Sequence, residues 1–114
     1  MTTKPSVIPA GEALLLRALV TPTEQGIASR VIAKASGGNV TLFAFDTGQE
    51  LSEHTAPFDA LVMVLEGSLL LTVGGEKVQA GPETLVRMPA YVPHAVEALE
   101  PTRMLLVMLR ELAS

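Results

Sequence analysis

The chain has 114 residues, 48% of them hydrophobic and 18% charged, so it is large and apolar enough to bury one core. A net charge of −4 and an aromatic content of 4% argue against nucleic-acid binding, which needs basic surfaces and stacking rings. There is no cysteine and no apolar run near the ~18 residues of a membrane span, so we expect a cytoplasmic protein without disulfides or membrane contact.

The N-terminal part, residues 1–25, is predicted to be a tail followed by a short helix. Residues 10–20 are rich in helix formers and place several leucines on one face. Pro22 and Gly26 are expected to end this helix. Residues 26–114 have a different sequence pattern, with short β-rich runs, and are predicted to form a single β domain.

Short apolar runs alternate with turn signals from residue 26 onward, at the spacing of an all-β sandwich or barrel. Gly74 and Gly75 mark a hairpin turn between two of these runs. The predicted strands are 27–34, 39–45, 60–67, 68–73, 76–80, 84–89, 94–99 and 102–110.

Several predicted strands are apolar on both faces, and residues 60–67 show this most clearly. A strand with one face in water should alternate apolar and polar residues. The predicted helix is too small to cover the whole outer face, and a large exposed apolar patch favours association. We therefore expect a homodimer, for which twofold symmetry is the commonest arrangement.

The chain has two histidines, His54 and His94, and each lies after a loop near a predicted strand. If His54 is on a strand, Ala56 shares its face. An imidazole titrates near neutral pH and also ligates metals. We expect the two histidines to meet at the mouth of the barrel, as candidates for ligand binding, metal binding or catalysis.

The stretch GQELSEHTAPFDALVMVLEG resembles the first motif of the cupin superfamily, G-x5-H-x-H-x(3,4)-E-x6-G. Gly48, His54 and Gly67 stand at its glycine, first histidine and final glycine. Ala56 stands where the family has its second histidine, and Ala60 where it has a glutamate.

Residues 81–98 are similar to the second cupin motif, G-x(5–7)-P-x-G-x2-H-x3-N, with Gly81, Pro89 and His94 in register. Tyr91 replaces the last glycine of this motif, and Ala98 replaces its asparagine. The resemblance covers roughly residues 39–109 and implies a small single-domain cupin. The implied fold is all-β, a jelly-roll barrel of two antiparallel sheets with a short N-terminal helix.

The family resemblance also implies a divalent metal site built from three histidines and one glutamate, of which only His54 and His94 remain. Zinc or iron sites normally have about three protein ligands. The depleted set therefore predicts at most a weakly held ion, such as Zn, Fe, Mn or Ni.

Ala56 and Ala60 are smaller than the family's ligands, so we expect a hollow beside the histidines. A largely apolar pocket with a few converging polar groups suits a small organic ligand. The residues expected to line the hollow, besides the histidines, are Val62, Val64, Met88 and Tyr91. Met63, Met88, Met104 and Met108 are interpreted as packing residues rather than soft-metal ligands.

Two functions are compatible with these features. The first is a module that holds a small molecule in the cavity, and the depleted ligand set favours it. The second is an enzyme of the oxygenase, isomerase or decarboxylase type, metal-assisted or acid–base, with His54, His94 and Tyr91 as catalytic candidates. In an acid–base enzyme, Asp59 would pair with a histidine. In the simpler interpretation, Asp59 accepts backbone hydrogen bonds in a turn and Tyr91 packs at the rim of the barrel.

Overall fold

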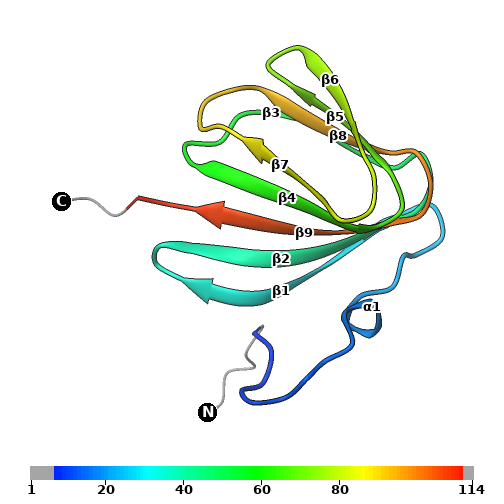
Figure 1. Ribbon diagram of the computed structural model, residues 1–114, viewed down its shortest axis with the longest axis vertical. Helices are drawn as coiled ribbons and strands as arrows, with labels where there is room; N and C mark the ends of the chain where they lie inside the picture. The colour runs from blue at the N-terminus through cyan, green and yellow to red at the C-terminus, as the bar shows by residue number, and fades with distance from the viewer. Residues whose placement is uncertain (1–6, 112–114) are drawn as a thin grey trace.

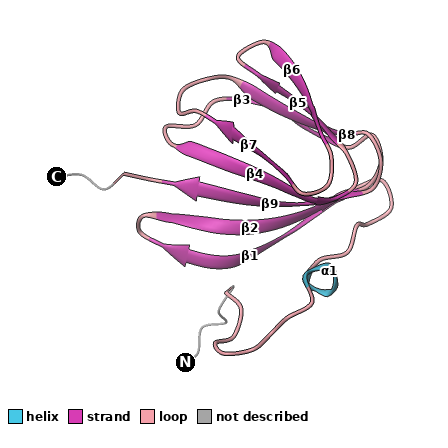
Figure 2. Cartoon of the chain, in the orientation of Figure 1, coloured by secondary structure: helices cyan, strands magenta, loops and turns pink. Residues whose placement is uncertain are grey.

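The computed structural model describes residues 7–111, in which the chain forms one short helix and nine strands (Figures 1 and 2). Residues 1–6 of the expected tail lie outside the described part. The elements are α1 (Leu16–Leu19), β1 (Ile27–Ala35), β2 (Gly38–Phe45), β3 (Glu50–His54), β4 (Asp59–Glu66), β5 (Leu69–Val73), β6 (Glu76–Ala80), β7 (Thr84–Met88), β8 (His94–Ala98) and β9 (Thr102–Leu109).

The strands form two antiparallel sheets, one with the order β1-β2-β9-β4-β7 and one with the order β3-β8-β5-β6. In Figure 1 β9 lies between β2 and β4 in the larger sheet, and the smaller sheet forms a second layer. This architecture confirms the predicted jelly-roll class with a short N-terminal helix. Within the described part of the chain, no helix has the length and apolar character needed to cross a membrane.

The core lies between the two sheets because the inward faces of their strands are aliphatic. In β4, Ala60, Val62 and Val64 are buried, whereas Met63 points the other way and is exposed. Met63 is therefore an outer-face residue, and its predicted packing role in the core is wrong. The buried members of the core are Phe45, Ala60, Val62, Val64, Leu69, Leu71, Ala80, Met88, Val96, Ala98 and Met104.

The N-terminal segment crosses the outer face of the larger sheet, where Val20 packs with Leu42 and Ala44. The helix spans only Leu16–Leu19, so the predicted helix over residues 10–20 is too long. Leu15 precedes the helix in an extended conformation and its apolar side chain makes no capping hydrogen bond, so no side chain supports the first turn at this end.

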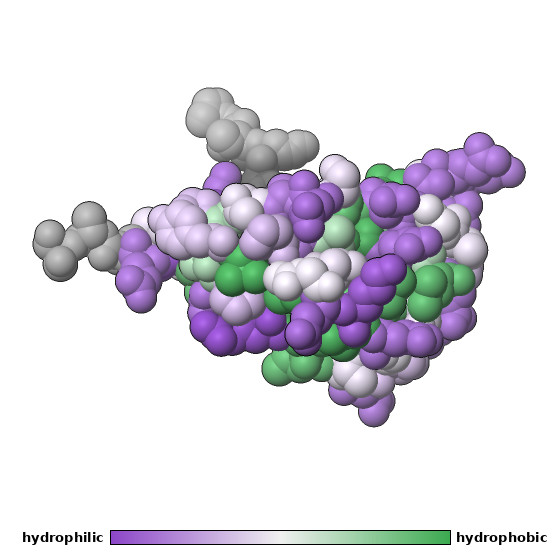
Figure 3. Space-filling view, turned by 90° about the horizontal axis from the view of Figure 1, so that it is seen from above, coloured by the Kyte–Doolittle hydropathy of each residue, from purple (hydrophilic) through white to green (hydrophobic). Residues whose placement is uncertain are grey.

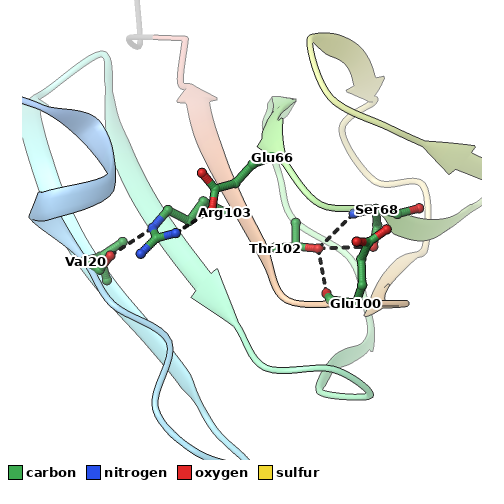
Figure 4. A network of polar contacts seen from close by, with 6 residues as sticks. All are labelled: Val20, Glu66, Ser68, Glu100, Thr102 and Arg103. Atoms are coloured by element: carbon green, nitrogen blue, oxygen red, sulfur yellow. Dashed lines mark hydrogen bonds and ion pairs between the residues drawn. The ribbon is translucent and has the colours of Figure 1, made fainter.

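Polar contacts centred on Arg103 and Thr102, two neighbouring residues at the start of β9, hold this segment and the strands around it in place (Figure 4). The Arg103 guanidinium donates to the backbone carbonyl of Val20 and pairs with the carboxylate of Glu66. Nearby, the buried hydroxyl of Thr102 accepts a hydrogen bond from the N–H of Ser68 at 3.0 Å and lies 2.8 Å from the Glu100 carbonyl. These bonds satisfy backbone groups where β9 begins, inside the protein.

Part of the outer face of the larger sheet is not covered by the N-terminal segment. Met63 and Leu85 are neighbours in register on β4 and β7, with exposures of 37% and 59%. Together with Leu15 and Leu16 they line a shallow surface depression. On the face seen from above in Figure 3, by contrast, green apolar areas are interspersed with hydrophilic residues.

Candidate functional site

The two histidines lie side by side on neighbouring strands of the smaller sheet. His54 ends β3 and His94 begins β8, and the two are partners in the strand register. Their Nε2 atoms are 3.1 Å apart, with the rings edge to face at an interplanar angle of 72°. The structure therefore brings together the two residues that the motif register predicted to meet.

The other ring nitrogen of each histidine faces a backbone carbonyl. His54 Nδ1 is 2.9 Å from the Ser52 oxygen, and His94 Nδ1 is 3.1 Å from the Val92 oxygen. A carbonyl only accepts hydrogen bonds, so each Nδ1 must carry the proton. In two neutral rings, both Nε2 atoms are then acceptors, although they lie only 3.1 Å apart.

A third partner is consequently needed between the two Nε2 atoms. One extra proton there would form an N–H···N bond and give the pair a single positive charge. A metal ion or the donor group of a ligand would satisfy the lone pairs equally well, and outer hydrogen bonds of this kind orient metal-ligating imidazoles.

The two imidazoles differ in their environment. His94 is only 5% exposed, whereas His54 is exposed to solvent. Burial lowers the pKa of His94 below its usual 6.5, the Val92 carbonyl opposes this, and the charged form of His54 adds to the lowering. His94 therefore favours the neutral, lone-pair-bearing form at physiological pH.

A cavity of about 180 Å³ opens beside the pair, between the two sheets. Ala56 and Ala60 both line it, at the two positions where the small side chains were expected to leave a hollow. Apart from the histidines, every lining residue is apolar. The lining consists of Leu51, His54, Ala56, Phe58, Ala60, Met88, His94, Val96, Met104, Leu106 and Met108.

Of the aliphatic residues predicted to line this cavity, Met88 does so, but Val62 and Val64 are not part of its lining. Both valines are fully buried further along β4, in the packed core. Sequence reasoning missed Phe58 and Leu51 as lining residues. Phe58 could have been predicted as a lining residue, because this aromatic residue directly follows Pro57, close after His54 in the sequence.

Tyr91 lies outside the cavity. Its side chain is 73% exposed and lines a separate, larger surface pocket that also includes Asp59, Arg110 and Glu111. Phe58 lines both hollows and so forms the partition between them. The Arg110 guanidinium lies 5.3 Å from the centre of the Phe58 ring, on the side of the outer pocket.

Asp59 does not pair with either histidine. Its carboxylate accepts hydrogen bonds from the Ala90 N–H at 2.9 Å and from Arg87 at 3.0 Å. The first of these bonds, helped by Arg87, lowers the pKa of the carboxyl below its usual 3.8. Asp59 therefore accepts a backbone hydrogen bond, as in the simpler interpretation, and the structure does not assemble a His–Asp–Tyr acid–base site.

The donor set does not fit a tightly held divalent ion. Among residues 7–111, no three His, Cys, Asp or Glu side chains are grouped so that they could hold a metal. The Nε2 atoms are close enough to share one ion at bonds of about 2.1 Å, but they bring no negative charge. The place of a third, carboxylate ligand is taken by the methyl group of Ala60.

Comparison with known proteins agrees with this fold. The cupin domain family matches residues 41–109, which include both histidines and all the strands from β3 to β9. No curated protein matches the chain.

Among solved structures, a conserved protein of unknown function from Streptococcus pyogenes is 31% identical, with a TM-score of 0.89 over 99% of this chain and 98% of that one. A cupin superfamily protein from Desulfitobacterium hafniense is 25% identical, with a TM-score of 0.85 over 96% of this chain and 100% of that one. A mutant salicylate 1,2-dioxygenase from Pseudoaminobacter salicylatoxidans shares the fold at 14% identity. Its TM-score is 0.69, and the match covers 73% of this chain and 26% of the dioxygenase chain. The family match and the full-length likeness together show that this chain belongs to the cupin superfamily, as a small single-domain member.

Proposed function

We propose that the protein binds a small, mostly apolar molecule in the barrel cavity and recognises one hydrogen-bond donor on it through His54 and His94. The observation that carries this proposal is the convergence of two Nε2 atoms, 3.1 Å apart, on the wall of an otherwise apolar cavity. Such a pocket selects a ligand by shape and by one polar group.

The size of the cavity limits the ligand. An apolar cavity of about 150 Å³ in another protein is large enough to hold benzene. The present cavity, at about 180 Å³, suits a molecule with one ring or a short branched chain. The thioether and aliphatic lining favours an apolar body without charges.

The protonation of the histidines sets the polar group of the ligand. With Nδ1 committed to backbone carbonyls, neutral His54 and His94 present only acceptors to the cavity. A hydroxyl or amino group would donate to them, whereas a methyl group would leave the buried Nε2 of His94 without a partner. Phenol therefore represents the proposed ligand class, and toluene is its matched apolar counterpart.

A divalent ion such as Zn, Fe, Mn or Ni plays no part in this proposal. Two neutral imidazoles supply neither the ligand number nor the charge that such an ion needs. An acid–base enzyme is likewise less well supported, because Tyr91 and Asp59 face the outer pocket instead of the histidines. Direct contact between ligand and imidazoles accounts for the geometry with the fewest additional groups.

Calorimetric titration with phenol and with toluene tests the proposal. We expect the wild-type protein to bind phenol about tenfold more tightly, which corresponds to one hydrogen bond to a buried acceptor. The double variant H54A/H94A should fold with nearly unchanged stability and lose this preference. In Ala60→Leu, the added side chain should fill the cavity and abolish binding of both compounds.

Equal affinities of the wild-type protein for phenol and toluene would overturn the role given to the histidines. Failure of both compounds to bind would overturn the cavity as a ligand site. A large loss of stability in H54A/H94A would show that the two imidazoles are structural.

The uncovered outer face of the larger sheet supports a further part of the proposal, a homodimer. Met63 and Leu85 are exposed there beside Leu15 and Leu16, so the apolar surface extends over β4, β7 and the segment at α1. A second copy of the chain would present the same surface, and a symmetric interface buries it on both subunits at once.

A further inference from the structure

The position of the family's carboxylate ligand has unusual neighbours in this chain. Ala60 occupies it on β4, and its register partners on the two adjacent strands are Met88 on β7 and Met108 on β9. Partners in register on antiparallel strands project to the same face of the sheet. The methyl group of Ala60 is thus flanked by two thioether side chains on the inner face.

Both methionines line the same cavity as the two histidines. The histidines come from the smaller sheet and the methionines from the larger one, and facing sheets are about 10 Å apart. Two imidazoles and two thioether side chains therefore line one small cavity, which has no carboxylate among its lining residues.

The character of these donors decides which ion they suit. All four are uncharged, and the sulfurs are soft and polarisable. Hard divalent ions prefer oxygen ligands and need compensating charge, whereas thioether and imidazole ligands favour copper(I). An ion with a single positive charge also leaves less uncompensated charge in a buried, apolar place than a divalent ion does.

We propose that this end of the cavity binds a soft, singly charged metal ion of the copper(I) type through His54, His94, Met88 and Met108. The site departs from the family's divalent site by exchanging the hard carboxylate for two thioethers. It gives Met88 and Met108 a role beyond the packing role predicted for them. The inference goes beyond small-molecule binding and does not rest on it.

The other described methionines provide internal references. Met104 also lines the cavity but lies four residues before Met108 on β9, a distance of about 13 Å along the strand. Met63 lies on the opposite, outer face of the larger sheet and is 37% exposed. An ion at the proposed site should therefore affect Met88 and Met108 directly, Met104 weakly and Met63 not at all.

The first experiment uses silver(I), a redox-inert ion of the same charge and softness, with protein labelled on the methionine methyl groups. We expect the NMR signals of Met88 and Met108 to shift and to saturate at one equivalent of silver(I), while that of Met63 stays in place. The ring signals of His54 and His94 should shift over the same range. Shifts confined to other methionines, or saturation without Met88 and Met108, would overturn the proposal.

The second experiment measures copper(I) affinity in ascorbate by competition with a chromophoric chelator. The variant M88L/M108L keeps side-chain volume and should keep the fold, which its thermal unfolding curve checks. We expect it to bind copper(I) at least tenfold more weakly than the wild type, whereas the matched control M63L should bind equally well. Equal affinity of M88L/M108L and wild type, or tighter binding of zinc(II) than of copper(I) by the wild type, would refute the site.

Discussion

The backbone N–H of Tyr91 donates a hydrogen bond of 2.7 Å to the carbonyl oxygen of Ala56. These residues stand at two of the places where the chain departs from the cupin motifs. The bond joins the loop after β3 to the turn before β8, and these are the segments that carry His54 and His94. The spacing of the two histidines is therefore held by backbone, independently of the side chains at 56 and 91.

Replacing Tyr91 by glycine should relieve backbone strain in the turn before β8. Tyr91 has a φ of 63°, a left-handed conformation that disfavours residues with a Cβ, and its side chain is 73% exposed. We expect Tyr91→Gly to be about 1 kcal/mol more stable than Tyr91→Ala in chemical denaturation. An alanine variant as stable as the glycine variant would contradict the strain assigned to this turn.

Removing the hydroxyl of Thr102 should destabilise the protein clearly. In Thr102→Val the N–H of Ser68 loses its acceptor in a place that is almost inaccessible to water. We expect a loss of about 1–3 kcal/mol in the free energy of unfolding, measured by denaturant titration.

The matched control is Thr84→Val. The Thr84 hydroxyl also donates to a carbonyl, that of Gly81, but at an exposed position where water can replace it. This variant should stay within about 0.5 kcal/mol of the wild type. Equal losses in the two variants would show that the Thr102 network contributes no more than a surface hydrogen bond.

Stability should decrease as the pH falls below about 6.5, because the pKa of His94 is lower in the folded protein than its usual 6.5. As the pH falls through 6.5, His94 takes up a proton in the unfolded chain before it does so in the folded protein, and this favours unfolding. The loss of stability ends once the pH is below the folded-state pKa of His94, and above pH 6.5 this residue has little effect. Denaturation midpoints between pH 5 and 8 measure the change.

The variant His94→Gln should flatten this dependence, whereas His54→Gln should retain most of it, because burial is the largest cause of the shift. Asp46 and Asp59 do not confound the measurement, since their pKa values lie below 3.8. An unchanged pH profile in His94→Gln would contradict the assignment.

Charge on the outer face should dissociate the proposed homodimer. Leu85→Glu places a carboxylate beside Met63 in the apolar patch, where a second copy would bury it without a partner. Light scattering after size-exclusion chromatography should show a dimer for the wild type and a monomer for this variant. Val78→Glu, at an exposed position on β6 of the other sheet, should remain dimeric. A monomeric wild type at micromolar concentration would refute the homodimer.

Most strands were predictable from the sequence because alternation and turn residues act locally, but β3 (Glu50–His54) was not among the predicted strands. The predicted strand 102–110 corresponds to Thr102–Leu109, and the predicted strand 27–34 to Ile27–Ala35. The helix was overestimated because leucine content favours a helix, whereas the segment gains more by laying Leu19 and Val20 on the sheet. Packing against distant strands decides that competition, and no local pattern records it.

The candidate site was predictable only in part. The register of the two motifs correctly placed His54 next to His94. The glycine that the first motif requires at position 67 also has a physical reason, because its φ is 95° and an added Cβ would lie 2.6 Å from the Thr102 Cα. The depth of the cavity was not predictable. A period of two tells which face a residue occupies, but not its level along the strand, so Val62 was placed at a hollow that lies nearer Ala60.

The central position of β9 in the larger sheet constrains how the protein can be made. Residues 38–45 and 59–66 both need residues 102–109 as a neighbour, so neither β2 nor β4 is complete until nearly the whole described chain has left the ribosome. Until then both strands offer an unpaired edge to any other nascent chain. Slower translation lengthens this interval, so the yield of soluble protein should respond to chaperone supply and growth temperature more than to small changes in the stability of the finished barrel.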